Sequence, residues 1–92
     1  MREKDFQAMV AAAAGHLNWL VFHDFDSRRS QPGYPDLCLV RGGRLVFLEL
    51  KTERGRVRPE QQVWLDALSQ VPGVVAMVAR PSQWDKILEM LR

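Results

Sequence analysis

Two carboxylates and an amine lie close together along residues 34–51, which read YPDLCLVRGGRLVFLELK. Asp36 precedes one apolar run, and Glu49 and Lys51 end another. Carboxylate oxygens suit Mg²⁺, which binds through one or two carboxylates plus waters and substrate phosphate. A neighbouring lysine could stabilise the charge that builds on phosphate oxygens. If the fold brings them together, these residue types can hydrolyse a phosphodiester with the help of a metal.

Gly42-Gly43 separates the apolar runs Leu37–Val40 and Leu45–Leu48. Two glycines between β-type runs predict a hairpin, because a primed turn needs positive φ at its central positions. With a two-residue loop, the facing pairs are Arg41 and Arg44, Val40 and Leu45, Cys38 and Phe47, and Asp36 and Glu49. Facing residues have Cβ atoms roughly 5 Å apart, and Lys51 shares the face of Glu49. Like charges at that distance need compensation, which Lys51 or a divalent cation would supply.

These residues resemble a known nuclease core. Pro35-Asp36 followed by Glu49-Leu50-Lys51 is similar to the P-D…(D/E)-x-K pattern. Gly55-Arg56 and Pro59-Glu60-Gln61 make the chain similar to the VRR-NUC branch of that superfamily, especially its short stand-alone phage or bacterial members. The resemblance covers residues 6–84 and implies a DNA nuclease dependent on Mg²⁺ or Mn²⁺. It implies that the metal ligands are Asp36, Glu49 and the main-chain carbonyl of Leu50.

The resemblance also implies roles for residues around the metal. Lys51 would orient a water or stabilise charge on the phosphate, and Gln61 would orient Lys51 or that water. An acidic residue on the first helix often completes the metal shell in such nucleases, and Glu3 is the carboxylate that could match. The alternative is that Glu3 complements the helix N-terminus. For Asp36, Glu49 and Lys51 the competing interpretation is a surface ion-pair cluster on an edge hairpin.

The segments around the hairpin predict an α/β fold. Apolar residues recur at helical spacing over Glu3–Leu17, and Glu3 lies on the same stripe, with Gln7 one turn further on. Trp19–Phe25 is predicted to be a strand covered on both faces, in which His23 is structural rather than a ligand. Cys38 is predicted to serve in packing.

The second half of the chain predicts a helix, a strand and a helix. Pro59 sits where a helix can begin, and over Pro59–Gln70 the pattern turns Gln61 inward and Gln62 to solvent. Val74–Ala79 predicts a buried strand that returns parallel through a right-handed crossover, and Pro81-Ser82 opens a last helix. The order α-β-β-β-α-β-α predicts a single α/β domain over residues 1–92, with a restriction-endonuclease-like mixed sheet flanked by helices.

Arginines gather in the middle of a chain whose net charge is only +2. A basic rim beside an acidic pair suits a phosphodiester substrate, and the alternative is ordinary solvated arginines. We expect the rim to include Arg41 and Arg44 as well as two loops. One loop contains an S-R-R-S segment that resembles short VRR-NUC members, and the other is the basic loop after Lys51. The predicted DNA contacts on these two loops are Arg28, Arg29, Ser30, Arg54, Arg56 and Arg58.

Composition excludes several classes of protein. One cysteine rules out an internal disulfide, and one cysteine with two histidines is too few for a convincing zinc site. The chain shows neither a secretory nor a membrane-spanning run, so we expect it to act in the cytoplasm. The resemblance implies that it is phage- or bacterium-encoded. The chain also shows no base-reading element, so recognition of DNA backbone and shape is expected.

Four functions compete. Stand-alone VRR-NUC proteins are similar to junction-resolving homodimers, so the favoured function is structure-selective cleavage of branched DNA such as Holliday junctions. A flap or nicking endonuclease, a non-catalytic DNA-binding module and a protein-interaction domain are the alternatives. Val63, Ala67 and Met90 lie outside the main apolar stripes and could form a dimer seam or pack within the chain.

Overall fold

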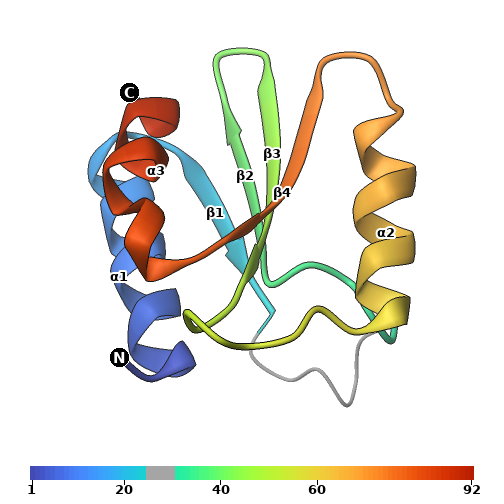
Figure 1. Ribbon diagram of the computed structural model, residues 1–92. Coiled ribbons are helices and arrows are strands. Elements are labelled where there is room, and N and C mark those ends of the chain that lie inside the picture. The colour runs from blue at the N-terminus through green and yellow to red at the C-terminus, as the bar shows by residue number, and fades with distance from the viewer. Residues whose placement is uncertain (25–30) are drawn as a thin grey trace.

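The computed structural model describes residues 1–24 and 31–92, so the predicted contacts Arg28, Arg29 and Ser30 lie outside the described residues. The element order confirms α-β-β-β-α-β-α (Figure 1), with a short 3₁₀ turn before the last helix. The elements are α1 (Glu3–His16), β1 (Leu20–His23), β2 (Leu37–Arg41), β3 (Arg44–Leu50), α2 (Pro59–Ser69), β4 (Val74–Ala79), η1 (Pro81–Gln83) and α3 (Trp84–Leu91).

One mixed sheet runs in the order β1-β2-β3-β4. The two junctions between β1, β2 and β3 are antiparallel, and β4 pairs parallel with β3, as a strand–helix–strand unit requires. The predicted hairpin register is confirmed where Arg41 pairs with Arg44 and Cys38 with Phe47. Gly42 and Gly43 both have positive φ, 55° and 78°, which is what a primed turn demands.

Helices cover both faces of the sheet (Figure 1). The helices α1 and α3 lie on one side of it, and α2 lies on the other. Apolar side chains of α1, α3 and the inner strands form the core between the first two layers. Because side chains alternate along β3, Leu48 and Leu50 enter this core while Phe47 points toward α2. Glu49 has the same parity as Phe47 and so leaves the core.

Both outer strands are more exposed than the sequence suggested. The strand β1 was predicted to be covered on both faces, but it is an edge strand in which Leu20 is 74% and Phe22 59% exposed. At the opposite edge, β4 is only partly buried. An apolar run of this length has the same composition in the centre and at the edge of a sheet, so strand order decided the exposure.

Arg41 and Arg44 do not belong to a basic rim around the acidic residues, and that prediction is wrong. They flank the hairpin turn, at the far end of the ladder from the carboxylates. Arg41 Nη1 donates to the carbonyl of Leu17 at 2.7 Å, and Arg44 Nη2 donates to that of Met90 at 2.7 Å. Both guanidinium groups also lie within 5 Å of the Trp19 ring centroid, at 4.7 and 4.9 Å. They therefore satisfy carbonyls at helix C-termini, where a cation is favourable.

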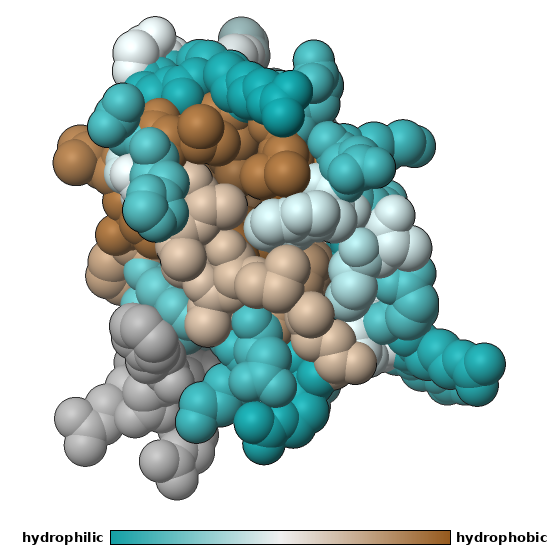
Figure 2. All heavy atoms as spheres, turned by 90° about the vertical axis from the view of Figure 1, so that its left-hand side faces the viewer, coloured by the Kyte–Doolittle hydropathy of each residue, from teal (hydrophilic) through white to brown (hydrophobic). Residues whose placement is uncertain are grey.

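The three apolar residues suggested as a dimer seam do not share a surface. Val63 and Ala67 are exposed on α2, whereas Met90 of α3 packs against the core on the other side of the sheet. Figure 2 shows the side with α1 and α3, where tan and brown atoms form an apolar area bordered by teal polar residues. No helix in the described ranges is both long and apolar enough to cross a membrane.

Candidate active site

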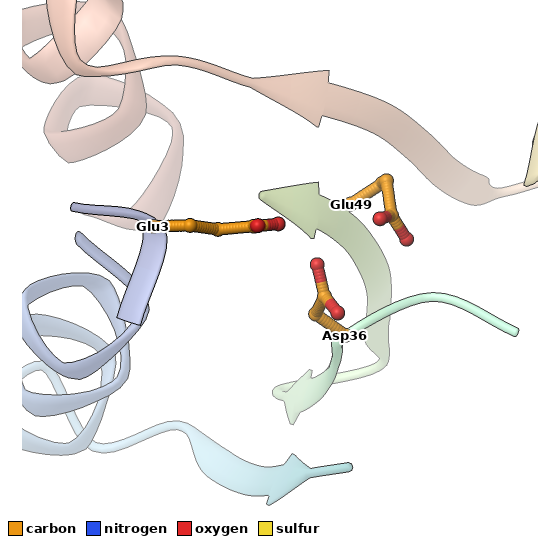
Figure 3. A group of neighbouring side chains, drawn as sticks. All are labelled: Glu3, Asp36 and Glu49. Atoms are coloured by element: carbon orange, nitrogen blue, oxygen red, sulfur yellow. The ribbon is translucent and has the colours of Figure 1, made fainter. Parts of the chain in front are cut away.

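Three carboxylates from three separate elements converge at one end of the sheet (Figure 3). Glu3 begins α1, Asp36 directly precedes β2, and Glu49 is the penultimate residue of β3. One ligand oxygen from each lies within 4.8 Å of the other two. The structure therefore brings together the three side chains that sequence reasoning placed in a metal shell.

Asp36 is held on two sides by main-chain contacts. The Leu50 N–H donates to Asp36 Oδ2 at 2.8 Å, and the Asp24 N–H donates to the Asp36 carbonyl at 2.9 Å. The buried Pro35 precedes it and restricts the backbone on that side. This carboxylate is therefore fixed by the sheet itself rather than by a flexible partner. The metal role of the Leu50 carbonyl stays a prediction.

Glu49 is only 2% exposed and has two cationic or donor groups beside it. Gln61 Nε2 donates to Glu49 Oε2 at 3.0 Å, and Lys51 Nζ lies 3.7 Å from the same oxygen. The Gln61 amide therefore contacts Glu49, and its role in orienting Lys51 or a water stays a prediction. Gln61 Oε1 accepts the Arg58 N–H at 2.8 Å, which caps the start of α2 and aims the amide nitrogen at the carboxylate.

Burial and mutual repulsion raise the proton affinity of the cluster. Burial, and after it the charge of Asp36, raise the pKa of Glu49 from 4.5 to about 8, although Lys51 opposes the shift. Burial also raises the pKa of Asp36, against the lowering effect of the Leu50 N–H and a hydrogen bond with Glu49. Without a cation Glu49 therefore retains a proton at neutral pH, although Lys51 lies beside it.

A cavity of about 350 Å³ opens over the carboxylates. Its wall includes two groups that the sequence did not suggest, Asp24 and Tyr34. Tyr34 packs edge-on against Phe47 and Trp64, at ring-centroid distances of 6.2 and 5.2 Å. Asp24 follows β1 and enters the site because β1 pairs with β2. That pairing is a long-range contact, so no local pattern could have indicated it.

The loop before Asp36 is packed closely on the start of α2. A Cβ on Gly33, whose φ is 87°, would collide with the Glu60 carbonyl oxygen. Only glycine combines this φ with so close an approach. The contact fixes the first turn of α2, and hence Gln61, relative to Asp36. Gln7 also lines the cavity, and its Oε1 lies 3.3 Å from His23 Nε2.

The family model of the VRR-NUC domain matches residues 3–82. The chain belongs to the VRR-NUC family. A solved structure described as "VRR_NUC domain" is 25% identical, with a TM-score of 0.76 and coverage of 95% of this chain and 94% of that one. Another, "VRR_NUC domain protein", is 20% identical, with a TM-score of 0.74 and coverage of 99% and 85%. None of the curated proteins matches. The family makes this a nuclease-fold domain that binds and processes DNA.

Three of the arginines predicted to contact DNA are described in the VRR-NUC domain. Arg54 and Arg56 are exposed on the loop that joins β3 to α2, and the exposed Arg58 also lines the cavity. This side of the site therefore presents positive charge next to a carboxylate cluster. The arrangement can attract a phosphodiester backbone while the carboxylates hold a cation.

Proposed function

We propose that this VRR-NUC domain is a Mg²⁺- or Mn²⁺-dependent deoxyribonuclease that cuts branched DNA. The observation that carries the proposal is the convergence of Glu3, Asp36 and Glu49 within 4.8 Å beside Lys51. An oxygen-only donor set fits a hard divalent cation. Such a cation would also replace the proton that Glu49 otherwise retains. The Leu50 carbonyl would be a further ligand, as the family resemblance implies.

The side chains around the cluster have distinct roles in this proposal. Glu3, Asp36 and Glu49 would hold the cation, which would polarise the scissile phosphate and lower the pKa of a water. Lys51 projects beside Glu49 and donates to phosphate oxygens as their charge grows. Gln61 holds the carboxylate of Glu49 in one orientation, as a partner of a metal ligand does.

The basic side of the cavity binds the DNA backbone. Arg54, Arg56 and Arg58 would contact phosphates, which orient a duplex without reading its bases. Among the described residues, the cavity wall offers carboxylates, amides, Lys51 and Arg58, with Tyr34 as its single aromatic ring, which favours recognition of shape. A four-way junction needs paired cuts in two strands, so the junction-resolving form of the enzyme would be a homodimer.

One observation favours a second candidate function, a flap or nicking endonuclease. The described residues contain a single group of three carboxylates able to hold a metal. A monomer with one such site makes one cut, which is all that a flap or a nick requires. The two functions share their chemistry and differ in the number of copies that act together.

The test is cleavage of end-labelled four-way junction, flap and linear duplex DNA with Mg²⁺, Mn²⁺ or EDTA. Lys51→Ala is compared with Lys86→Ala, which changes an exposed lysine on α3. We expect paired symmetric cuts in the junction that disappear with EDTA or Lys51→Ala and persist with Lys86→Ala. Single cuts confined to flap DNA would instead support the second candidate function, a flap or nicking endonuclease. Binding without cleavage would leave a non-catalytic DNA-binding module.

A further inference from the structure

Arg80 makes an unusual set of contacts immediately after β4. Its Nη1 donates to the carbonyl oxygens of Thr52 at 2.6 Å, Gly55 at 2.8 Å and Glu53 at 3.3 Å. All three acceptors belong to the loop that leaves β3. A guanidinium group binds several acceptors in a fixed plane. Arg80 is therefore an internal anchor for main chain that has no regular secondary structure.

The anchored loop begins at the proposed catalytic lysine. Lys51 donates its N–H to the Ala79 carbonyl at 3.0 Å, and the chain then turns, with the Gly55 N–H donating to the Thr52 carbonyl at 3.2 Å. A Cβ on Gly55 would lie 3.5 Å from Lys51 Cδ. The turn thus packs along the aliphatic part of the Lys51 side chain. The position of this turn therefore affects where the side chains of Lys51 and of the loop arginines Arg54 and Arg56 lie.

A second contact ties the loop to the same segment in the reverse direction. Glu53 Oε2 accepts the Ser82 N–H at 3.0 Å. Hydrogen bonding from the Ser82 side chain, and after it from the Ser82 N–H, lowers the pKa of Glu53. The main chain of Arg80 is itself fixed, because its N–H donates to Gln83 Oε1 at 3.0 Å. Residues 80–83 therefore form a rigid base, and Arg80 extends from it to the loop.

We infer that Arg80 is a positioning residue of the nuclease site. It holds the loop against Lys51 and presents Arg54 and Arg56 to the DNA backbone as one pre-arranged unit. It acts through the loop, because its Nη1 binds three main-chain carbonyls there. The inference rests on the proposed nuclease function. Pre-arranged contacts cost less ordering entropy on binding than contacts from a free loop.

The first test measures binding of a four-way junction by fluorescence anisotropy, in EDTA and over a range of KCl concentrations. We compare the wild type with Arg80→Ala, the double variant Arg54→Ala/Arg56→Ala and the triple variant. If Arg80 acts through the loop, Arg80→Ala lowers the salt slope by about one to two counterions, as the double variant does. The triple variant, which combines all three substitutions, then shows no further decrease in the salt slope.

The matched control is Arg44→Ala. Arg44 also donates to main-chain carbonyls, Met90 and Arg92, but at the far end of the sheet. We expect it to lower the unfolding midpoint without changing the salt slope. Arg80→Lys keeps the positive charge and provides a folded alternative should Arg80→Ala fail to fold. If geometry rather than charge matters, its salt slope stays below that of the wild type.

Hydrogen exchange in the absence of DNA provides an independent readout. Arg80→Ala should speed exchange at residues 52–58 while β2 and β3 keep their protection. An unchanged salt slope, or a loss that adds to that of the double variant, overturns the inference. A failure of the proposed nuclease function gives a different result. The wild type then shows no salt-dependent binding of DNA, and the double variant binds no differently from it. In that case exchange alone decides whether Arg80 holds the loop.

Discussion

Two segments of this VRR-NUC domain have nearly the same sequence and the same local structure. Residues 58–61 read RPEQ and begin α2, whereas residues 80–83 read RPSQ and lead into α3. In each, the arginine N–H donates to the glutamine Oε1 three residues later, at 2.8 and 3.0 Å. Proline occupies the first helical position in both, where its missing N–H costs nothing.

The surroundings of the two caps differ. The amide nitrogen of Gln61 donates to the buried Glu49, while the nearest carboxylate contact of the second cap is from Ser82 to the exposed Glu53. The pKa of Glu49 is raised and that of Glu53 is lowered. The arginines differ as well, because Arg58 lines the cavity and Arg80 binds the loop. The same capping motif thus lies beside a proposed metal ligand at the start of α2 and beside an anchored loop before α3.

The largest contrast is expected between the two glutamates. Glu49→Gln removes a proposed metal ligand, so junction cleavage should disappear while the chain stays folded. Glu53→Gln changes a carboxylate of the second cap and should leave cleavage within a few-fold of the wild type. Both are measured by junction cleavage in Mg²⁺ and by circular dichroism. Cleavage by Glu49→Gln at the wild-type rate would remove Glu49 from the metal site.

The pH dependence of stability should separate the same two glutamates. Glu49 has an ordinary pKa of 4.5 that rises to about 8, so between these values the folded, metal-free chain binds more protons than the unfolded chain. The free energy of unfolding therefore falls as pH rises through this window. The lowered pKa of Glu53 acts in the opposite sense, since its contribution is lost as pH falls through that pKa.

In EDTA we thus expect the unfolding midpoint to drop by about 5 °C or more between about pH 5 and pH 8.5. Glu49→Gln should flatten this decline and Glu53→Gln should not. Adding Mn²⁺ should raise the midpoint more at the higher pH, because the metal binds deprotonated ligands. A midpoint that rises with pH in EDTA would contradict the raised pKa of Glu49. Scanning calorimetry across the range makes the measurement.

Substitution of the two glutamines tests the caps themselves. Gln61→Ala and Gln83→Ala each remove one cap acceptor and should each cost about 1 kcal/mol of stability. Only Gln61→Ala also frees the Glu49 carboxylate, so we expect it to lower the cleavage rate about 10- to 100-fold. Chemical denaturation and single-turnover cleavage report the two effects separately. Equal losses of rate in both variants would show that the caps act only through stability.

Arg58→Ala is expected to give the smallest effect of the series. Arg58 is exposed at the cavity, so its removal should weaken DNA binding a few-fold and reduce the salt slope by about one counterion. Because its N–H belongs to the main chain, the cap remains and stability should be unchanged. Anisotropy titrations in KCl provide the measurement. Loss of stability without loss of binding would place Arg58 with the structural arginines.

Much of the site followed from local sequence. Gly42-Gly43 and the alternation around it defined the hairpin register, and the register put Asp36 beside Glu49 with Lys51 on the same face. Helical spacing put Glu3 on the inward side of α1 and Gln61 on the inward side of α2. These inferences held because turn conformation and side-chain alternation depend on neighbours within a few residues.

The partner of each side chain was decided by tertiary structure. Sequence alone placed Arg41 and Arg58 in the same basic rim, but Arg41 binds a helix C-terminus and Arg58 lines the cavity. Likewise, the sheet order left β1 exposed at an edge, although its composition suits a covered strand. A residue type fixes which bonds a side chain can make. Contacts between distant segments fix which of them it does make, because they depend on how helices and strands pack.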